Sequence, residues 1–253
     1  MIRLGYKKCL LSIDEVWDIY DNSDIKAFNG TDILVKKITK KNGSEYCRKR
    51  KTLITDLKRT PEEIYGDFDN QVKRSIKRVS ALSYECQFHD STEFLKDDRL
   101  FKEFKESYYE FIKKKKLLPG NLSKLKKFAL NNNLTMAVGI LENSPLVYRV
   151  FIHDDNYVRG LYSVSKFRNT KVRKEQNNIA YLNKMLLYQE LLYFRNKNLS
   201  IYDWGGISDE TEEKKRISYF KRQFGGKEFQ YFETMESKSL RGRIALKVIN
   251  KLL

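Results

Sequence analysis

Two hydrophobic patterns follow one another in the second half of the chain. Three apolar runs, LTMAVGILEN, LVYRVFIHDD and YVRGLYSVSKF, are separated by short turns rich in Asn, Ser and Asp. Such runs, bounded by turn residues, are typical of strands. The next segment, NNIAYLNKMLLYQELLYFRNK, is apolar nearly all round, which predicts a long and deeply packed helix.

The same patterns continue to the C-terminus. LSIYDW predicts a buried strand, ISYFKRQF a short helix stopped by Gly225-Gly226, EFQYFETM a last strand and LRGRIALKVINKLL a terminal helix. A long helix between two strands is the usual crossover between parallel strands. Together these elements predict a mixed α/β sheet.

Helical periodicity dominates the middle of the chain. Thr60 is a candidate N-cap with Pro61 at the first helical position, and basic residues gather near the end of this helix. The segments DDRLFKEFKESYYEFIKKKKLL and GNLSKLKKFALNN predict two further helices. The apolar positions of the first helix are Ile64, Phe68, Val72, Ile76 and Val79.

The N-terminal part predicts strands and turns around one short helix. In SIDEVWDIYDN, Ser12 and Glu15 have the spacing of a capping box and predict a helix start. DILVKKITKKNGSEYCRKRKTLITDL predicts a β-hairpin, because Asn42-Gly43 is a strong hairpin-turn signal. We expect one domain over residues 1–253, with N-terminal strands and hairpin (1–58), a helical segment (59–133) and the core (134–253).

Composition narrows the class of protein. The 41% hydrophobic and 13% aromatic shares predict a globular chain, and no run is long enough to span a bilayer. Three cysteines without metal-ligand spacing and two histidines predict reduced thiols, no metal site and a cytoplasmic location, and the N-terminus lacks a signal-peptide pattern. The net charge of +17 favours polyanionic partners, although an AT-rich genome would also enrich lysine.

Several of these motifs, in this order, resemble the GNAT acyltransferase superfamily. They are RGLYSVSKFRN, the long helix, YDWGGIS and FKRQFGG, with a weaker echo in TLITDLKRTPEEIYGDFDNQVKRSIKRV, so the resemblance covers about Lys51 to Phe232. The resembled branch holds the Fem peptidoglycan-bridge aminoacyltransferases and their single-domain relatives from polysaccharide gene clusters. It implies a GNAT-like fold, here with an N-terminal β-hairpin and helix extension, whose sheet splays open to admit the donor.

The resemblance also sets expectations about the donor. Fem enzymes have two such domains, and this chain has the length of one with an extension. This chain lacks the Arg-x-x-Gly-x-Gly/Ala pyrophosphate loop of acetyl-CoA enzymes and has the basic segment SKFRNTKVRKEQNN in its place. Fem-like members also lack that loop. The implied donor is an acyl-CoA or an aminoacyl-tRNA.

Three residues are candidates for catalysis. The resemblance places a functional lysine at Lys221, where a partly desolvated ammonium could hold a phosphate or an oxyanion. Asp203, at the end of a strand, could orient or deprotonate an amine, or cap the following turn. Glu142 ends the first predicted strand of the meander, where many GNAT enzymes keep a general base, or it is a turn residue.

A larger set is predicted to line the donor cleft. The glycine pairs shape its walls beside aromatic residues, Tyr162 and Ser163 could donate hydrogen bonds to the donor carbonyl, and basic residues at the start of the long helix could contact phosphates. The alternatives are packing for the tyrosine and a solvated loop for the basic residues. The set is Tyr162, Ser163, Arg168, Lys171, Arg173, Trp204, Gly205, Gly206, Phe220, Gly225 and Gly226.

Three functions remain open at this point. The leading hypothesis is acyl transfer, acetyl or aminoacyl, to an amino group of a nucleotide- or lipid-linked sugar or another cell-envelope precursor. The second is Fem-like transfer from aminoacyl-tRNA to a peptidoglycan bridge. The third is a non-catalytic, basic nucleic-acid-binding protein. Expected partners are a phosphate-bearing or lipid-linked substrate, tRNA, and the inner face of the membrane through peripheral contact.

Overall fold

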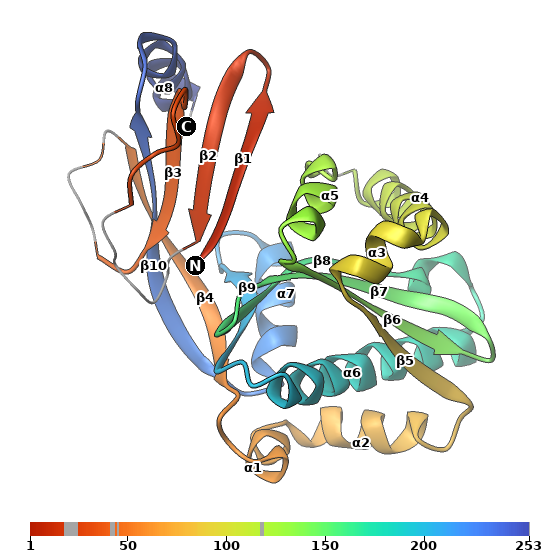
Figure 1. The fold of residues 1–253 in the computed structure, drawn as a ribbon. Helices are drawn as coiled ribbons and strands as arrows, with labels where there is room; N and C mark the ends of the chain where they lie inside the picture. The colour runs from red at the N-terminus through yellow and green to blue at the C-terminus, as the bar shows by residue number, and fades with distance from the viewer. Residues whose placement is uncertain (18–24, 41–43, 45, 117–118, 253) are drawn as a thin grey trace. The chain divides into compact units, whose positions relative to one another are not determined.

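The chain divides into two compact units in the computed structural model, which describes residues 1–17, 25–40, 44, 46–116 and 119–252 (Figure 1). Unit 1 comprises Met1–Thr52, Gly206–Ser208 and Glu228–Leu253. Unit 2 comprises Leu53–Gly205 and Asp209–Lys227. The expectation that they act as a single domain stays a prediction.

Unit 2 is built on a mixed sheet with the strand order β4-β9-β8-β7-β6-β5. The strands β6, β7 and β8 form an antiparallel meander, and β9 is parallel to β8. Both features confirm the prediction from the three apolar runs and the crossover helix. The strands are β4 (Tyr46–Asp56, shared with unit 1), β5 (Tyr84–His89), β6 (Leu134–Leu141), β7 (Ser144–His153), β8 (Tyr157–Ser165) and β9 (Ile201–Ile207).

Helices cover both faces of this sheet. Figure 1 shows α3, α4 and α5 on one face and α6 on the other, with α2 packed against α6. The helices of unit 2 are α1 (Pro61–Gly66), α2 (Asn70–Val79), α3 (Ser91–Lys96), α4 (Asp98–Lys115), α5 (Ser123–Leu130), α6 (Arg173–Asn196) and α7 (Glu212–Arg222), with the 3-10 turn η1 (Lys166–Asn169) before α6.

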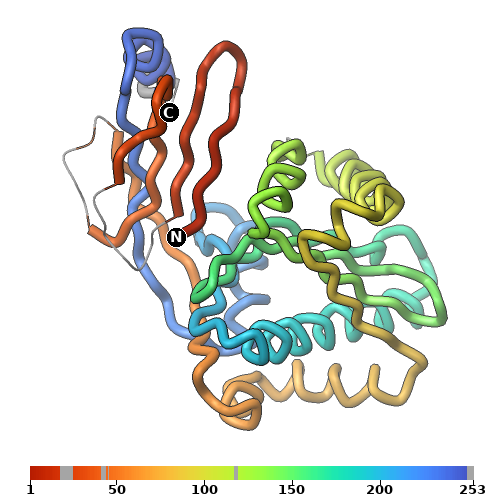
Figure 2. The backbone as a smooth tube through the Cα atoms, viewed as in Figure 1, coloured from red at the N-terminus to blue at the C-terminus, as the bar shows by residue number. Residues whose placement is uncertain are grey.

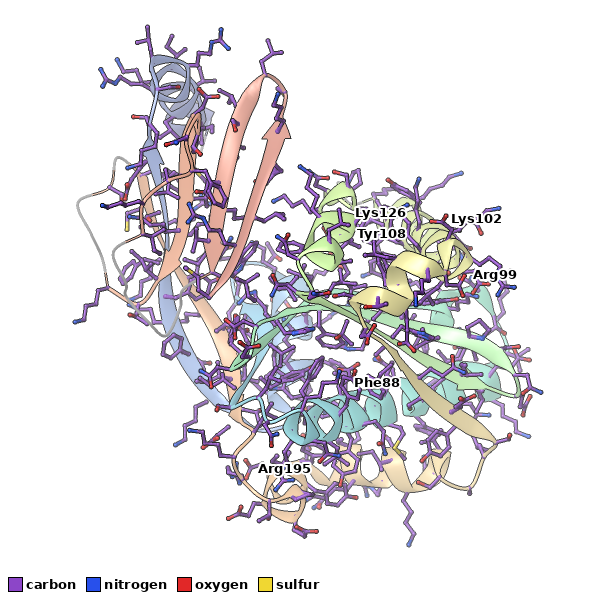
Figure 3. All side chains as sticks on the ribbon, viewed as in Figure 1. Phe88, Arg99, Lys102, Tyr108, Lys126 and Arg195 are labelled. Carbon is purple, nitrogen blue, oxygen red and sulfur yellow. The ribbon has the colours of Figure 1, made fainter. Side chains whose placement is uncertain are left out.

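The long helix α6 forms the centre of the unit 2 core. Its apolar residues are buried on several sides, as the pattern predicted, and Phe194 at its end packs edge-on against Phe151 of β7. Phe88 of β5, labelled in Figure 3, stacks on Tyr193 of the same helix with ring centroids 4.2 Å apart. Two charged residues, Lys184 and Glu190, are buried in α6 as well.

The first predicted helix has the expected start and an unexpected break. Thr60 and Glu63 form the capping box of α1, with Pro61 at its first position. Helix α1 ends at Gly66, and Asp69, in an extended conformation, precedes the start of α2 at Asn70. Phe68, in this break, is buried and packs edge-on against Phe224, so core packing is gained where the helix is interrupted.

Unit 1 assembles a sheet from both ends of the chain, with the order β1-β2-β3-β10-β4. β2 is parallel to β3, and β10 is antiparallel to β3. Figure 2 shows the backbone of β1 and β2 joined by a tight turn. The elements are β1 (Ile2–Lys8), β2 (Leu11–Trp17), β3 (Ile33–Ile38), β10 (Lys227–Ser237), the first half of β4, and the terminal helix α8 (Leu240–Leu252).

The helix predicted to start at Ser12 is wrong over 12–17, because these residues belong to strand β2, and the rest of the predicted helix, 18–22, lies outside the described residues. Its acidic residues are buried and paired across strands. Asp14 accepts two hydrogen bonds from Arg3 of β1, at 2.5 and 3.1 Å, and Glu15 pairs with Lys37 of β3 at 2.5 Å. These long-range partners stabilise the strand and override the local capping signal.

The hairpin predicted between residues 32 and 57 is also wrong in its pairing. Both strands exist, as β3 and β4, but β10 lies between them in the sheet. β10 pairs with β3 from Phe232↔Ile38 to Ser237↔Ile33. The predicted turn at Asn42-Gly43 lies outside the described residues.

Candidate functional site

The parallel ladder of β8 and β9 is short. It pairs Tyr157–Arg159 with Ile201–Asp203, and both strands continue beyond it, β8 to Ser165 and β9 to Ile207. Ladder ends of this kind free backbone groups on both strands. Predicted site residues of unit 2 meet at this point.

Glycines bring the two strands and α7 close together at the ladder end. Gly205 has φ of +79°, and a Cβ there would lie 3.1 Å from the carbonyl oxygen of Gly160 and 3.4 Å from Nζ of Lys221. Only glycine adopts this φ without strain, and a Cβ here would crowd the Gly160 carbonyl oxygen while just touching the amine. The glycine at 205 therefore places the Lys221 amine beside the ends of β8 and β9.

The Lys221 amine lies in a setting that weakens its proton affinity. Burial, together with the positive charges of Arg159 and Arg149, lowers the pKa of Lys221 to about 8, and the Asp203 carboxylate partly opposes this shift. An amine with this pKa is mostly protonated at neutral pH and can exchange its proton at little cost. This combination of burial and specific charged neighbours is typical of functional sites.

Asp203 is fully occupied by protein partners. Its carboxylate accepts hydrogen bonds from the Tyr157 hydroxyl at 2.6 Å, from Arg159 at 2.5 Å and from the backbone N–H of Gly205 at 2.7 Å. The side chain is completely buried. This geometry favours the structural alternative, in which Asp203 caps the Gly205 turn and holds Arg159 in place.

A second buried ion pair lies on the α6 side of the sheet. Arg149 of β7 contacts Glu190 of α6 at 2.7 Å, and the Tyr202 hydroxyl donates to the same carboxylate at 2.9 Å. Burial raises the pKa of Glu190 to about 7, opposed by the charge of Arg149. Arg149 also donates to the hydroxyl of Ser163, an exposed residue, at 3.0 Å, so its guanidinium links the core to the part of β8 that lies beyond the ladder with β9.

The sequence motifs do not predict Arg149, Arg159 and Glu190 as site residues. Each is a charged residue within an apolar run: LVYRVFI, YVRGLY and YQELLYF. Charged residues are almost never fully buried unless they are paired. A charged residue inside an apolar run therefore indicates a buried ion pair, and this was the signal that could have identified the three residues.

The aromatic candidates form one wall of unit 2. The Trp204 indole donates to Thr55 at 2.9 Å and packs on Phe224, with ring centroids 5.1 Å apart. Phe220 packs on the same ring at 5.5 Å. Trp204 and Phe224 are buried, so their observed role is to fix α7, and with it Lys221, against β9.

Gly225 and Gly226 fix the end of α7. Both have positive φ, of +74° and +91°. A Cβ on Gly225 would lie 2.5 Å from the Cβ of Asp67, and one on Gly226 would lie 2.7 Å from the carbonyl oxygen of Ile54. The pair therefore allows a close backbone approach to β4 and to the α1–α2 break.

Three further candidates, Tyr162, Gly206 and Glu142, have surroundings of their own. The Tyr162 ring packs on Tyr108 of α4, labelled in Figure 3, at 5.3 Å between centroids. Gly206 is exposed and belongs to unit 1. Glu142 is exposed in the β6–β7 turn with φ of +50°, near the Ser165 end of β8.

The basic candidates cluster at the start of α6. Arg168, Lys171 and Arg173 are all exposed. Arg168 lines a shallow pocket between α4 and η1, together with Lys114 and Lys166. This cluster fits a phosphate-bearing ligand by its charge, and no described contact joins it to Lys221.

The described residues contain no group of His, Cys, Asp and Glu that could hold a metal ion. The three cysteines are free thiols. Within the same residues, no helix combines the length and apolar character needed to cross a membrane.

No family model and no curated protein matches this sequence. Solved structures do match. FemX aligns with a TM-score of 0.56 at 12% identity, over 72% of this chain and 61% of its own. The C-terminal domain of a putative lysylphosphatidylglycerol synthetase from Agrobacterium fabrum aligns at 0.55 and 10%, over 86% and 71%. L-PGS from Bacillus licheniformis aligns at 0.52 and 13%, over 85% and 71%.

These similarities confirm the fold predicted from the motifs. The protein shares its fold with FemX and with these lysylphosphatidylglycerol synthetases, and it is a mixed α/β structure. The chain spans 61% of the length of FemX.

Proposed function

We propose that this chain is an acyltransferase that moves an acyl or aminoacyl group from a thioester or ester donor to an amine. One observation carries the proposal: the half-buried Lys221 side chain, with its amine pKa lowered to about 8, lies beside Gly205 at the end of the β8–β9 ladder. The fold supports it, because the neighbours named above include a synthetase of lysylphosphatidylglycerol.

The reaction needs a group that stabilises negative charge. The acceptor nitrogen attacks the carbonyl carbon of the donor, and the carbonyl oxygen becomes an oxyanion. The C–S or C–O bond then breaks, the thiolate or alkoxide leaves, and the proton released by the amine neutralises it. In this mechanism the protonated Lys221 donates a hydrogen bond to the oxyanion.

The two buried arginines keep this site positive. Arg159 is held by Asp203 and Arg149 by Glu190, so their positions do not depend on solvent. Preorganised charges of this kind need no reorganisation during the reaction. Arg159 and Arg149 also lower the pKa of Lys221, which makes its proton easier to share with the developing oxyanion.

The proposed acceptor is an amino group on a phosphate-bearing molecule, such as a nucleotide- or lipid-linked amino sugar. Support comes from the net charge of +17 and from the exposed cluster of Arg168, Lys171 and Arg173. Cations gathered near a helix start favour phosphate groups.

A second candidate is transfer from an aminoacyl-tRNA donor. The same exposed basic cluster favours it, because a tRNA backbone would need several such contacts and would bind less tightly as salt rises. Acyl-CoA would use fewer phosphates, so salt sensitivity separates the two donors.

A thermal-shift screen with acetyl-CoA, charged tRNA and uncharged tRNA tests the proposal. A donor present at ~100 times its dissociation constant adds about 2.7 kcal/mol to the stability of the folded state. Stabilisation by acetyl-CoA or by charged tRNA, followed by acyl transfer to UDP-glucosamine that Lys221→Met abolishes, supports it. Equal binding of charged and uncharged tRNA, without transfer from either donor, contradicts it and favours the nucleic-acid-binding alternative.

A further inference from the structure

The terminal helix α8 has two apolar faces, and unit 1 covers one of them. On the inner face, Leu246 is buried against Ile13, Ile33 and Val35. On the outer face, Leu240, Ile244 and Val248 are 72%, 59% and 52% exposed. Residues four apart lie on one face of a helix, so these three make a continuous aliphatic stripe.

Cations flank this stripe on both sides. At 3.6 residues per turn, Arg241 lies along one edge of the stripe and Arg243 and Lys247 lie along the other. All three are exposed, and the sequence LRGRIALKVINKL contains no acidic residue. The nearby carboxylate of Asp32 is half-buried; it accepts hydrogen bonds from the Ser12 N–H and the Ser239 hydroxyl and interacts electrostatically with Arg241.

The β1–β2 turn, also in unit 1, combines exposed aliphatic and basic side chains as α8 does. Leu10 at its tip is 89% exposed, with Lys7 and Lys8 exposed beside it. The next residue, Leu11, packs with the cluster that Leu246 belongs to. The turn therefore lies close to α8, and Figure 1 shows both at one end of unit 1.

We propose that these two elements, the α8–hairpin surface, bind the headgroup region of an anionic lipid bilayer. An aliphatic stripe bordered by Arg and Lys is the pattern of helices that lie in a membrane interface. Each cation near an anionic surface adds attraction, and the aliphatic side chains leave water at the acyl boundary. A second copy of this chain would instead bring like charges together.

Vesicle co-sedimentation of the full chain tests this surface. The protein is expected to bind vesicles of phosphatidylcholine mixed with phosphatidylglycerol, to bind pure phosphatidylcholine weakly, and to dissociate from the anionic vesicles as salt rises. The double variant Ile244→Asp, Val248→Asp is expected to bind at least about tenfold more weakly, because it removes apolar contacts and adds negative charge. Both positions are exposed, so its melting temperature is expected to stay close to that of the parent.

Leu130→Asp is the matched control, since Leu130 is 70% exposed on α5 of unit 2, outside the proposed surface. This variant is expected to bind anionic vesicles as the parent does. Equal loss of binding in the control and the double variant overturns the proposal. So does absence of binding to anionic vesicles, or self-association that only the double variant abolishes. None of these readouts uses acyl transfer, so the result is independent of the proposed function.

Discussion

Lys221 is expected to lower the free energy of unfolding, because its ammonium group is less favourable in the folded state than in water. Its pKa falls from 10.5 to about 8, chiefly by burial, so the folded state binds the proton less tightly than the unfolded state. The penalty is complete below pH 8 and is relieved as pH rises from 8 towards 10.5. Each unit of pKa shift corresponds to about 1.4 kcal/mol.

Lys221→Met is therefore expected to stabilise the fold at pH 7, by roughly 1–3 kcal/mol, while removing activity. The gain should shrink as the pH rises above 8. Chemical denaturation of parent and variant at several pH values measures this difference. Lys215→Met, at an exposed position on the same helix, serves as the control and should change stability little. A stability gain that is absent at pH 7 contradicts the buried setting of Lys221.

The buried carboxylate of Asp203 is expected to stabilise the fold. Asp203→Asn keeps the shape but leaves the Arg159 guanidinium without its buried counter-charge, so we expect a loss of about 3–5 kcal/mol. Tyr157→Phe removes only one of the hydrogen bonds to Asp203 and should cost about 1 kcal/mol. Urea unfolding measures both. Similar small losses in the two variants would contradict the structural role of Asp203.

Sequence patterns located the site in part. Lys221, Asp203 and Gly205 follow from the motifs, and the structure brings them together. The partners Arg149, Arg159 and Glu190 could not be placed, because their pairing joins strands β7 and β8 to α6 and β9. Pairing of side chains that lie 41 and 44 residues apart follows from the fold and not from local spacing.

At the scale of elements, local patterns predicted unit 2 better than unit 1. The meander β6–β8 and helix α6 use neighbours in sequence, so periodicity alone identifies them. β2 was predicted as a helix because its stabilising partner Lys37 lies 22 residues from Glu15. β3 and β4 were paired wrongly because β10, from the other end of the chain, inserts between them.

The packing of α8 against the rest of unit 1 depends on one glycine, Gly242. A Cβ on Gly242 would lie 2.0 Å from the carbonyl oxygen of Asp32. Gly242→Ala must therefore displace the helix, and we expect it to destabilise α8 and expose Leu246. Gly66→Ala is the control, because no atom lies within 4 Å of a Cβ there. Hydrogen exchange of α8 amides is expected to accelerate in the first variant alone, and unchanged protection in Gly242→Ala would contradict this packing.

At the scale of the whole molecule, the central proposal is that this fold places one half-buried lysine, Lys221, where an acyl group would be transferred. The fold follows from the similarity to solved structures, and the lysine follows from the geometry at the end of the β8–β9 ladder. The similarity of fold and the setting of Lys221 are independent observations, since the charged environment of Lys221 comes from this chain's own residues.

The most direct measurement is the rate of acyl transfer to UDP-glucosamine as a function of pH, with acetyl-CoA and with alanyl-tRNA as donors. We predict that kcat falls as Lys221 loses its proton above pH about 8, apart from the titration of the acceptor amine. Lys221→Met should lower kcat by about 10²–10³-fold, as loss of an oxyanion donor does, while Lys215→Met retains the parent rate. Transfer at the parent rate by Lys221→Met would contradict the account.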